Sequence, residues 1–130
     1  MFVDSSALIA IIRREPEKSV LASRLEKAAT AVTSPLVILE TVMRLTTILN
    51  NDVETARAIV RDFLLEANIR VVPITDSVGE AAIDAFARFG KGRGHKARLN
   101  LADCMTYATA RELGQPILYK GDDFAATDLA

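Results

Sequence analysis

The sequence of 130 residues is poor in the side chains that crosslink small domains. It contains one cysteine, Cys104, one histidine, His95, and no tryptophan. A single cysteine cannot form an internal disulfide, and this pair supplies too few ligands for a structural zinc site. A chain of this length buries roughly two thirds of its extended surface on folding, so its core needs no crosslink. The sequence therefore predicts a single globular domain over residues 1–130.

Long apolar runs and an excess of charge of one sign are also missing. No uncharged apolar run approaches the roughly 18 residues of a membrane-spanning helix, and the stretch 7–12 ends at Arg13 and Arg14. Asp4 stands where a secretory signal would carry a basic residue, so we expect a cytoplasmic protein with no membrane partner. Sixteen basic and seventeen acidic residues leave a net charge of −1. Binding of nucleic acid would therefore depend on a local basic patch.

The hydrophobic periodicity and the chain breakers predict strands that alternate with one or two helices. The predicted strands cover residues 1–3, 31–33, 70–74 and 116–119, and the predicted helices cover 6–15, 17–28, 35–49, 53–67, 77–89 and 100–113. Asp52 and Asp76 are the expected N-caps of two of these helices. The connections are too long for hairpins, which indicates an α/β domain with a mostly parallel sheet. Such sheets bind ligands beyond the carboxyl ends of their strands.

Acidic residues follow the first and the last predicted strands. Asp4 could serve only as a helix cap, but Ser5 or Ser6 could cap that helix equally well. Asp122 and Asp123 follow the last strand, where a polar turn would explain them without a functional role. Taken alone, the turn is the better explanation of this pair.

Two further acids lie on predicted helices. Glu40 interrupts a largely apolar face, where a charge is costly unless it is paired; an ion pair with Arg44 at i+4 is the alternative. Asp103 lies three residues after Asn100, a spacing typical of a capping box. Its helical face also carries small or polar side chains that leave room for an ion, namely Thr106, Tyr107 and Ala110.

These acids lie on elements that can converge at one edge of the sheet. Clustered carboxylates repel one another, and hard oxygen ligands without histidine or cysteine favour Mg²⁺ or Mn²⁺. Such ions can hold a water molecule and a scissile phosphate, which is the chemistry of phosphodiester hydrolysis. The pattern is therefore more informative than any single acid.

The sequence resembles the PIN-domain toxins of the VapC type over essentially its whole length. The resemblance rests on four ordered motifs: Val3 to Leu8, Glu40 in a helix led by Ser34-Pro35, Gly94 to Cys104, and Leu118 to Phe124 with Thr127-Asp128. It implies a three-layer α/β/α domain and a Mg²⁺- or Mn²⁺-dependent endoribonuclease, with RNA as substrate. It also implies inhibition by a cognate VapB-type antitoxin and a homodimer. The acidic positions of the family fall on Asp4, Glu40 and Asp103, with the fourth at Asp122 or Asp123.

A basic, glycine-spaced loop precedes Asp103. Its candidate RNA-binding residues are Lys91, Arg93, His95, Lys96 and Arg98. Gly92 and Gly94 would let backbone amides approach phosphate, although a solvated loop is the simpler explanation of a run of charges. His95 lacks a nucleophile to pair with, so we expect it to cap the loop or to contact RNA. Cys104 is expected to be a packed helical side chain rather than a nucleophile.

Three amphipathic segments have more apolar surface than one small core uses. These segments are Ile9–Arg14, Leu36–Leu49 and Val53–Ala67, and they are the expected contacts for an antitoxin and a second copy of the chain. Two rival functions remain open at this point. Lys120 with Gly121-Asp122-Asp123 would suit a haloacid-dehalogenase-like phosphatase, but Ser6 stands where that class carries its second aspartate. A non-catalytic module that binds RNA or a partner is the other rival.

Overall fold

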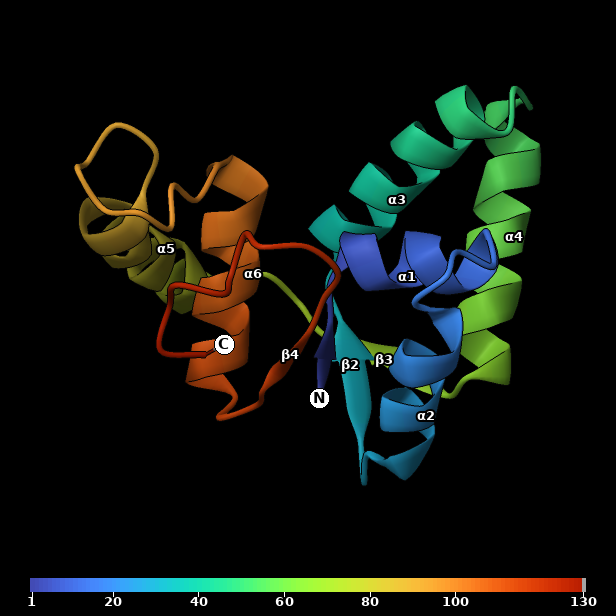
Figure 1. Ribbon diagram of the computed structural model, residues 1–130, viewed down its shortest axis with the longest axis horizontal. Helices are drawn as coiled ribbons and strands as arrows, with labels where there is room; N and C mark the ends of the chain where they lie inside the picture. The colour runs from blue at the N-terminus through green and yellow to red at the C-terminus, as the bar shows by residue number, and fades with distance from the viewer. Residues whose placement is uncertain (130) are drawn as a thin grey trace.

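The computed structural model describes residues 1–129, and within that range the chain forms six helices and four strands (Figure 1). In chain order the elements are β1 (Phe2–Val3), α1 (Ser5–Ile12), α2 (Lys18–Lys27), β2 (Ala31–Thr33), α3 (Pro35–Ile48), α4 (Val53–Glu66), β3 (Ile69–Val71), α5 (Asp76–Phe89), α6 (Leu101–Glu112) and β4 (Ile117–Leu118). None of the described helices is long and apolar enough to cross a membrane.

The four strands form one sheet in the order β3-β2-β1-β4, and every pairing is parallel. Helices α1 to α4 cover one side of the sheet and α5 with α6 cover the other, as Figure 1 shows. This arrangement confirms the predicted three-layer α/β domain, with a sheet that is wholly parallel. The first strand is central because Phe2 pairs with both Val32 and Ile117. The residue that follows β1 therefore lies at the middle of the carboxyl edge.

Most helix starts follow the predicted caps. Asp52 accepts a hydrogen bond from the backbone N–H of Thr55, as expected. The prediction for Asp76 is wrong, because the hydroxyl of Thr75 caps α5 by accepting from the N–H of Val78. A hydroxyl one residue earlier fills the same role, so the helix starts one residue sooner.

The third strand is shorter than predicted and ends at Val71 rather than at residue 74. Val72 still donates its backbone N–H to Thr33, and Pro73 has no N–H to continue the ladder. Helix α2 likewise begins at Lys18, one residue after the predicted start.

Helix α1 lies in the core and not on the surface. Leu8 is fully buried, and Ile9 and Ile11 are nearly so. The expectation that Ile9–Arg14 leaves apolar surface for a partner is therefore wrong for most of that segment. The packing of α1 beneath α3 and α2 uses this surface inside the domain. It also fixes Asp4, the N-cap of α1, at the sheet edge.

Candidate active site

Asp4 lies at the carboxyl end of the central strand and is only 6% exposed. Its backbone N–H donates to the carbonyl of Leu118, so the residue is held between β1 and β4. One carboxylate oxygen, Oδ2, accepts hydrogen bonds from the Ser6 hydroxyl at 2.6 Å and from the Ser6 N–H at 3.1 Å. The other oxygen accepts from the hydroxyl of Thr106 at 3.4 Å. The side chain thus caps α1 and also faces α6.

Burial raises the pKa of Asp4, and the nearby charge of Glu40 raises it further, against the lowering effect of the Ser6 hydrogen bonds. Loss of hydration disfavours the ionised form of a carboxyl group, and a second negative charge has the same effect. Ionised Asp4 is therefore an unfavourable species in the protein alone. A cation placed beside it would remove that penalty.

Asp103 lies in the first turn of α6 and is 8% exposed. It forms the predicted capping box with Asn100: each side chain accepts from the other residue's backbone N–H, at 3.1 Å and 2.9 Å. The capping role is thus real, and it occupies the Oδ2 oxygen of Asp103. Even so, burial outweighs the lowering effect of the capping hydrogen bond and raises the pKa of Asp103 to about 7, and the charges of Asp123, Asp4 and Glu40 add to the rise.

Glu40 is half-buried on α3, and the hydroxyl of Ser5 donates to its Oε1 atom. The alternative ion pair with Arg44 does not form. Among the described residues, none of the six ion pairs involves Asp4, Glu40, Asp103 or Asp123. These carboxylates therefore act on one another without a basic side chain to neutralise them.

The two acids after β4 differ in their surroundings. Asp123 is among the charges that raise the pKa of Asp103, and it lines a pocket together with Ser6. The contact that the structure gives Asp122 is a backbone one, from its carbonyl to the N–H of Ala125. Both side chains are exposed. Of the two candidates, Asp123 is the one brought toward Asp103.

The donor set suits a hard divalent cation. Four carboxylates supply oxygen ligands, two of them are buried with raised pKa values, and no lysine or arginine of the described chain pairs with them. No three of the described acidic, histidine or cysteine side chains are gathered tightly enough to enclose one ion by themselves. Mg²⁺ commonly keeps several water ligands and takes only one or two carboxylates directly, so this looser grouping fits it.

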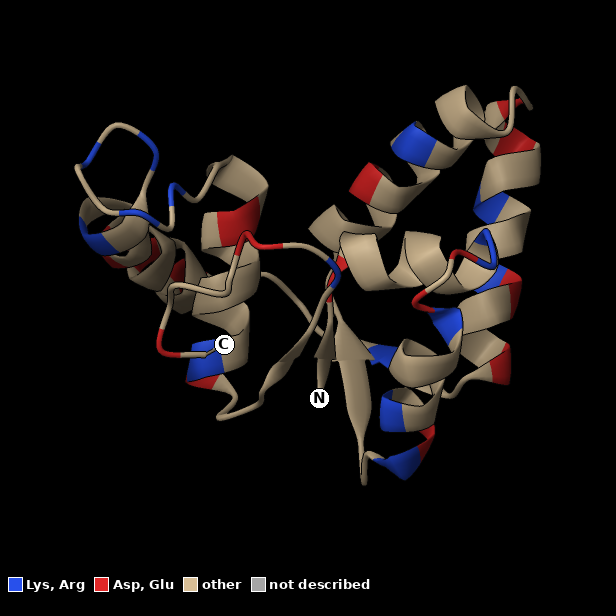
Figure 2. Ribbon diagram, in the orientation of Figure 1, with Lys and Arg blue, Asp and Glu red and all other residues tan. Residues whose placement is uncertain are grey.

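The basic loop after α5 is anchored at both ends. The N–H of Lys91 donates to Leu99 and the N–H of Leu99 donates to Phe89, while the side chain of Leu99 is buried. Its four cations are all exposed and form no ion pair within residues 1–129: Lys91, Arg93, Lys96 and Arg98. Figure 2 shows this loop beside the amino-terminal end of α6, which carries Asp103.

His95 and Cys104 have the local roles expected of them. The Nδ1 atom of His95 accepts from the N–H of Ala97 at 3.0 Å, and its ring packs edge-on against Phe89 at 4.9 Å. His95 therefore caps the loop from within. Cys104 is buried in α6, where burial raises the pKa of its thiol, so it is a packed and unreactive side chain.

Comparison with known proteins decides the family. The sequence model of the PIN domain matches residues 1–129. A VapC ribonuclease of Rhizobium meliloti is 40% identical over 139 aligned positions, which cover 98% of each chain. Ribonuclease VapC28 of Mycobacterium tuberculosis is 38% identical over 98% of this chain and 93% of its own length. The chain belongs to the VapC ribonucleases of the PIN-domain family. The resemblance in the sequence motifs is thereby confirmed, and the dehalogenase-like alternative is wrong.

Solved structures agree with this VapC fold. VapC20 of Mycobacterium tuberculosis, a sarcin–ricin loop cleaving toxin, superposes with a TM-score of 0.76 over 99% of this chain and 95% of its own. Its sequence is 24% identical, so the likeness supports the fold alone.

The sequence pattern of this VapC-family chain does not reveal the roles of two hydroxyls. It predicts Ser5 and Ser6 only as alternatives to Asp4 as a helix cap, whereas in the structure they hold the carboxylates of Glu40 and Asp4. Ser6 also accepts the N–H of Lys120, which ties Asp4 to the loop that carries Asp123. The sequence signal for this role is a pair of adjacent serines directly after an acid at the end of a strand.

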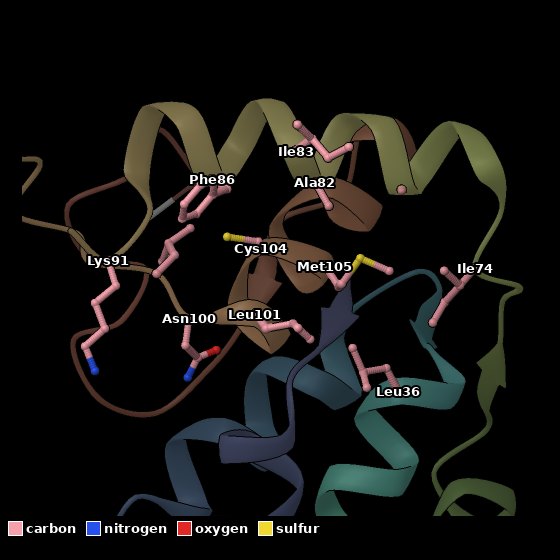
Figure 3. Close-up of a pocket in the computed structure, with 12 residues that line it drawn as sticks. Leu36, Ile74, Ala82, Ile83, Phe86, Lys91, Asn100, Leu101, Cys104 and Met105 are labelled. Carbon is pink, nitrogen blue, oxygen red and sulfur yellow. The ribbon is translucent and has the colours of Figure 1, made fainter. Parts of the chain in front are cut away.

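An apolar groove of about 840 Å³ lies between α5, α6 and the start of α3. Figure 3 shows Phe86 and Ile83 of α5 above Cys104 and Met105 of α6, with Leu36 of α3 at the far end. Asn100, the capping partner of Asp103, also lines the groove. The groove therefore adjoins the carboxylate site, and Lys91 of the basic loop is the charged residue in its lining.

Proposed function

We propose that this protein is a Mg²⁺- or Mn²⁺-dependent endoribonuclease that acts as the toxin of a toxin–antitoxin pair in the cytoplasm. The observation that carries the proposal is the pair of buried carboxylates, Asp4 and Asp103. Their pKa values are raised, other acids surround them, and no basic side chain of residues 1–129 pairs with them. A buried carboxylate with a purely structural role is usually paired with a positive charge, and these two have only neutral hydrogen-bond donors.

Asp4, Glu40, Asp103 and Asp123 are the residues we assign to hold the cation, with Asp122 as the less favoured choice for the fourth position. When bound, the ion would supply an activated water molecule and neutralise charge on the scissile phosphate. Ser6 holds Asp4 in place, and Ser5 holds Glu40. Asn100 fixes the Oδ2 atom of Asp103 and leaves Oδ1 for a ligand. The chain therefore orients its acids through hydroxyls and backbone groups that add no positive charge.

The basic loop is the proposed contact for the RNA backbone. Its four exposed cations have no acidic partner in the described chain, so they are available to phosphate. Lys96 and Arg98 directly precede the helix of Asp103. They would place phosphates beside the acids without reading the base sequence.

The direct test incubates the purified protein with a defined RNA pool in EDTA, Mg²⁺ or Mn²⁺, and sequences the new ends. Metal-dependent internal cuts that Asp103→Asn abolishes support the proposal. Binding of RNA without any cut in all three conditions would instead indicate the non-catalytic module.

The second part of the proposal is a cognate VapB-type antitoxin. An active ribonuclease in the cytoplasm would be harmful to its own cell, and the relatives are VapC ribonucleases. Co-expression with the product of the adjacent upstream gene tests this partner. We expect a stable complex with suppressed cleavage, and failure to co-purify would contradict it.

The third part is a homodimer through the apolar groove. Side chains of Ile83, Phe86 and Leu101 are largely exposed there, and Leu39 and Met43 extend the surface along α3. One face thus carries both a hollow and protruding apolar groups, which suits a self-complementary interface between two copies.

Light scattering at micromolar concentration tests the dimer. Phe86→Glu should give a monomer, whereas Leu65→Glu should not, because Leu65 is exposed on α4, on the other side of the sheet from α5 and α6 (Figure 1). A monomeric wild-type protein would overturn this part.

A further inference from the structure

A second pocket lies on the opposite side of the carboxylates from the basic loop. Its volume is about 280 Å³, and its lining residues come from α1, α3 and the segments after α1 and β4. Ser6, which holds Asp4, and Asp123 are among the residues that line it, so the pocket adjoins the acid site. Ile48 provides apolar surface over the buried Ile9. Arg13, Arg44 and Lys120 provide positive charge, and Glu15 joins Asp123 as an acid of the lining.

The charges of this pocket are not all used within the fold. Arg13 pairs with Glu15 at 2.7 Å, and Lys120 pairs with Glu15 at 2.9 Å and with Glu17 at 3.3 Å. Arg44 is exposed and forms no ion pair with any residue of the described chain. The ion pairs of Arg13 and Lys120 hold these side chains in the pocket wall. Arg44 is the pocket cation whose guanidinium has no acidic partner and can bind a ligand.

The placement of Arg44 on α3 is specific. It lies one helical turn beyond Glu40, so the same helix presents an acid to the site and a base just past it. Figure 2 shows the basic loop on one side of the central acids and the basic residue of α3 on the other. In this view the acidic segments lie between the loop and the basic residue of α3, so a single strand that contacts both can cross the acid site.

We propose that the Arg44 pocket binds a backbone phosphate of single-stranded RNA on one side of the scissile bond, while the loop of residues 91–98 binds the other side. This inference rests on the proposed ribonuclease function. The guanidinium of Arg44 offers the paired donors that suit a phosphate, and the half-buried side chain of Ile48 offers a surface for the adjoining sugar. The two basic regions together would fix the position of the cut relative to the ends of the bound strand.

The first test measures binding and does not require cleavage. Anisotropy of a fluorescein-labelled 12-nucleotide RNA in EDTA gives the affinity as a function of salt. Arg44→Gln should bind several-fold more weakly and lower the salt slope by about 0.7, the value for one phosphate contact on a single strand. Arg44→Lys should keep the slope, because the charge remains. Arg24→Gln, at an exposed site on α2, is the matched control and should resemble wild type.

The second test uses an RNA that the wild-type protein cleaves, shortened one nucleotide at a time from either end. Trimming from one end should erase the effect of Arg44→Gln on KM, and trimming from the other end should erase the effect of Lys96→Ala with Arg98→Ala. An unchanged salt slope in Arg44→Gln would contradict the proposed phosphate site. The site would also be contradicted if trimming from the same end erased the KM effects of both variants. If wild type cleaves no RNA, the proposed function fails, and the binding measurement still decides the pocket.

Discussion

Two aspartates at the two ends of helix α6 have opposite electrostatic environments: Asp128 is surrounded by basic groups, and Asp103 is surrounded by acids. Asp128 packs near the carboxyl-terminal end of α6, where it accepts hydrogen bonds from the hydroxyl of Tyr107 at 2.5 Å and from Arg111 at 2.6 Å, with Arg88 at 3.6 Å. The hydrogen bond from Tyr107, the one from Arg111 and the charge of Arg111 hold the pKa of Asp128 below its usual value, against the raising effect of burial. Asp103, at the other end, has acids for neighbours and a pKa raised to about 7.

This difference in charged neighbours distinguishes a carboxylate that stabilises the fold from one that is left without a positively charged partner. Asp128 ties the end of the chain to α5 and α6 through groups already present. Asp103 is capped on one oxygen but has no positive charge to oppose it within residues 1–129.

The largest effect is expected at the two buried acids. Asp4→Asn or Asp103→Asn should lower RNA cleavage by more than about 100-fold, because each removes a proposed ligand of the metal. Circular dichroism should show an intact fold. Asp128→Asn is the matched control, and its cleavage rate should stay within a few-fold of wild type at a temperature where it is folded. Equal losses in Asp103→Asn and Asp128→Asn would remove the distinction.

Glu40→Gln should be nearly as severe, with a loss of roughly 10- to 100-fold. The amide keeps the hydrogen bond from Ser5 but loses the negative charge. Single-turnover rates at saturating RNA measure this effect. Ser5→Ala tests the same position from the other side and should cost about 10-fold, through misplacement of Glu40. Wild-type rates in Glu40→Gln would assign Glu40 to the surface.

The basic loop should govern affinity and not the chemical step. Lys96→Ala with Arg98→Ala should reduce the salt slope of RNA binding by about 1.4, from two phosphate contacts at about 0.7 each. The rate at saturating RNA should change little. A constant slope together with lost cleavage would give these residues a catalytic role instead.

Asp128→Asn should lower the melting temperature by roughly 3–5 °C, from about 1 kcal/mol at a partly exposed ion pair. The folded-state pKa of Asp128 lies below the unfolded value, so its contribution is full above that unfolded value near pH 4 and is lost as pH falls through the folded one. Thermal melts of wild type and Asp128→Asn at pH 7 and pH 3 check this pH dependence. A difference in melting temperature that grows on acidification would contradict it.

Asp103→Asn should act in the other direction in the absence of metal. The folded-state pKa of about 7 exceeds the usual 3.8, so the folded protein retains a proton that the unfolded chain loses, and stability falls as pH rises between those values. Removing the charge should raise the melting temperature in EDTA at pH 8 by roughly 3–5 °C, about 1 kcal/mol. Near pH 4 the gain should vanish. A lower midpoint at pH 8 would mean that the capping box dominates.

The sequence was sufficient for the order of the elements and for the fold class. Strand and helix periodicities differ, and caps such as Ser34 and Asn100 mark helix starts by local chemistry. The sequence does not show in the same way which elements pack against each other. The apolar face of α1 looked like surplus surface, but α2 and α3 cover it. Amphipathicity shows that a face is buried and does not show by what.

The site was predictable as a set of acids and not as a geometry. The spacing from Asn100 to Asp103 predicted the capping box, yet the raised pKa of Asp103 depends on acids distant in sequence. Adjacent acids such as Asp122 and Asp123 cannot be ranked by pattern, because the turn after Gly121 decides which one faces the site. Gly121 has a φ of +96°, a conformation that glycine adopts without strain.

Calorimetric titration of Mn²⁺ into wild type, Asp103→Asn and Asp128→Asn at pH 8 tests the central contrast most directly. Wild type and Asp128→Asn should bind the ion with similar affinity, because Asp128 already has its cations. Asp103→Asn should bind at least about 10-fold more weakly. Equal affinity in all three proteins, or no binding by wild type, would contradict the assignment of Asp103 as a carboxylate kept for a metal.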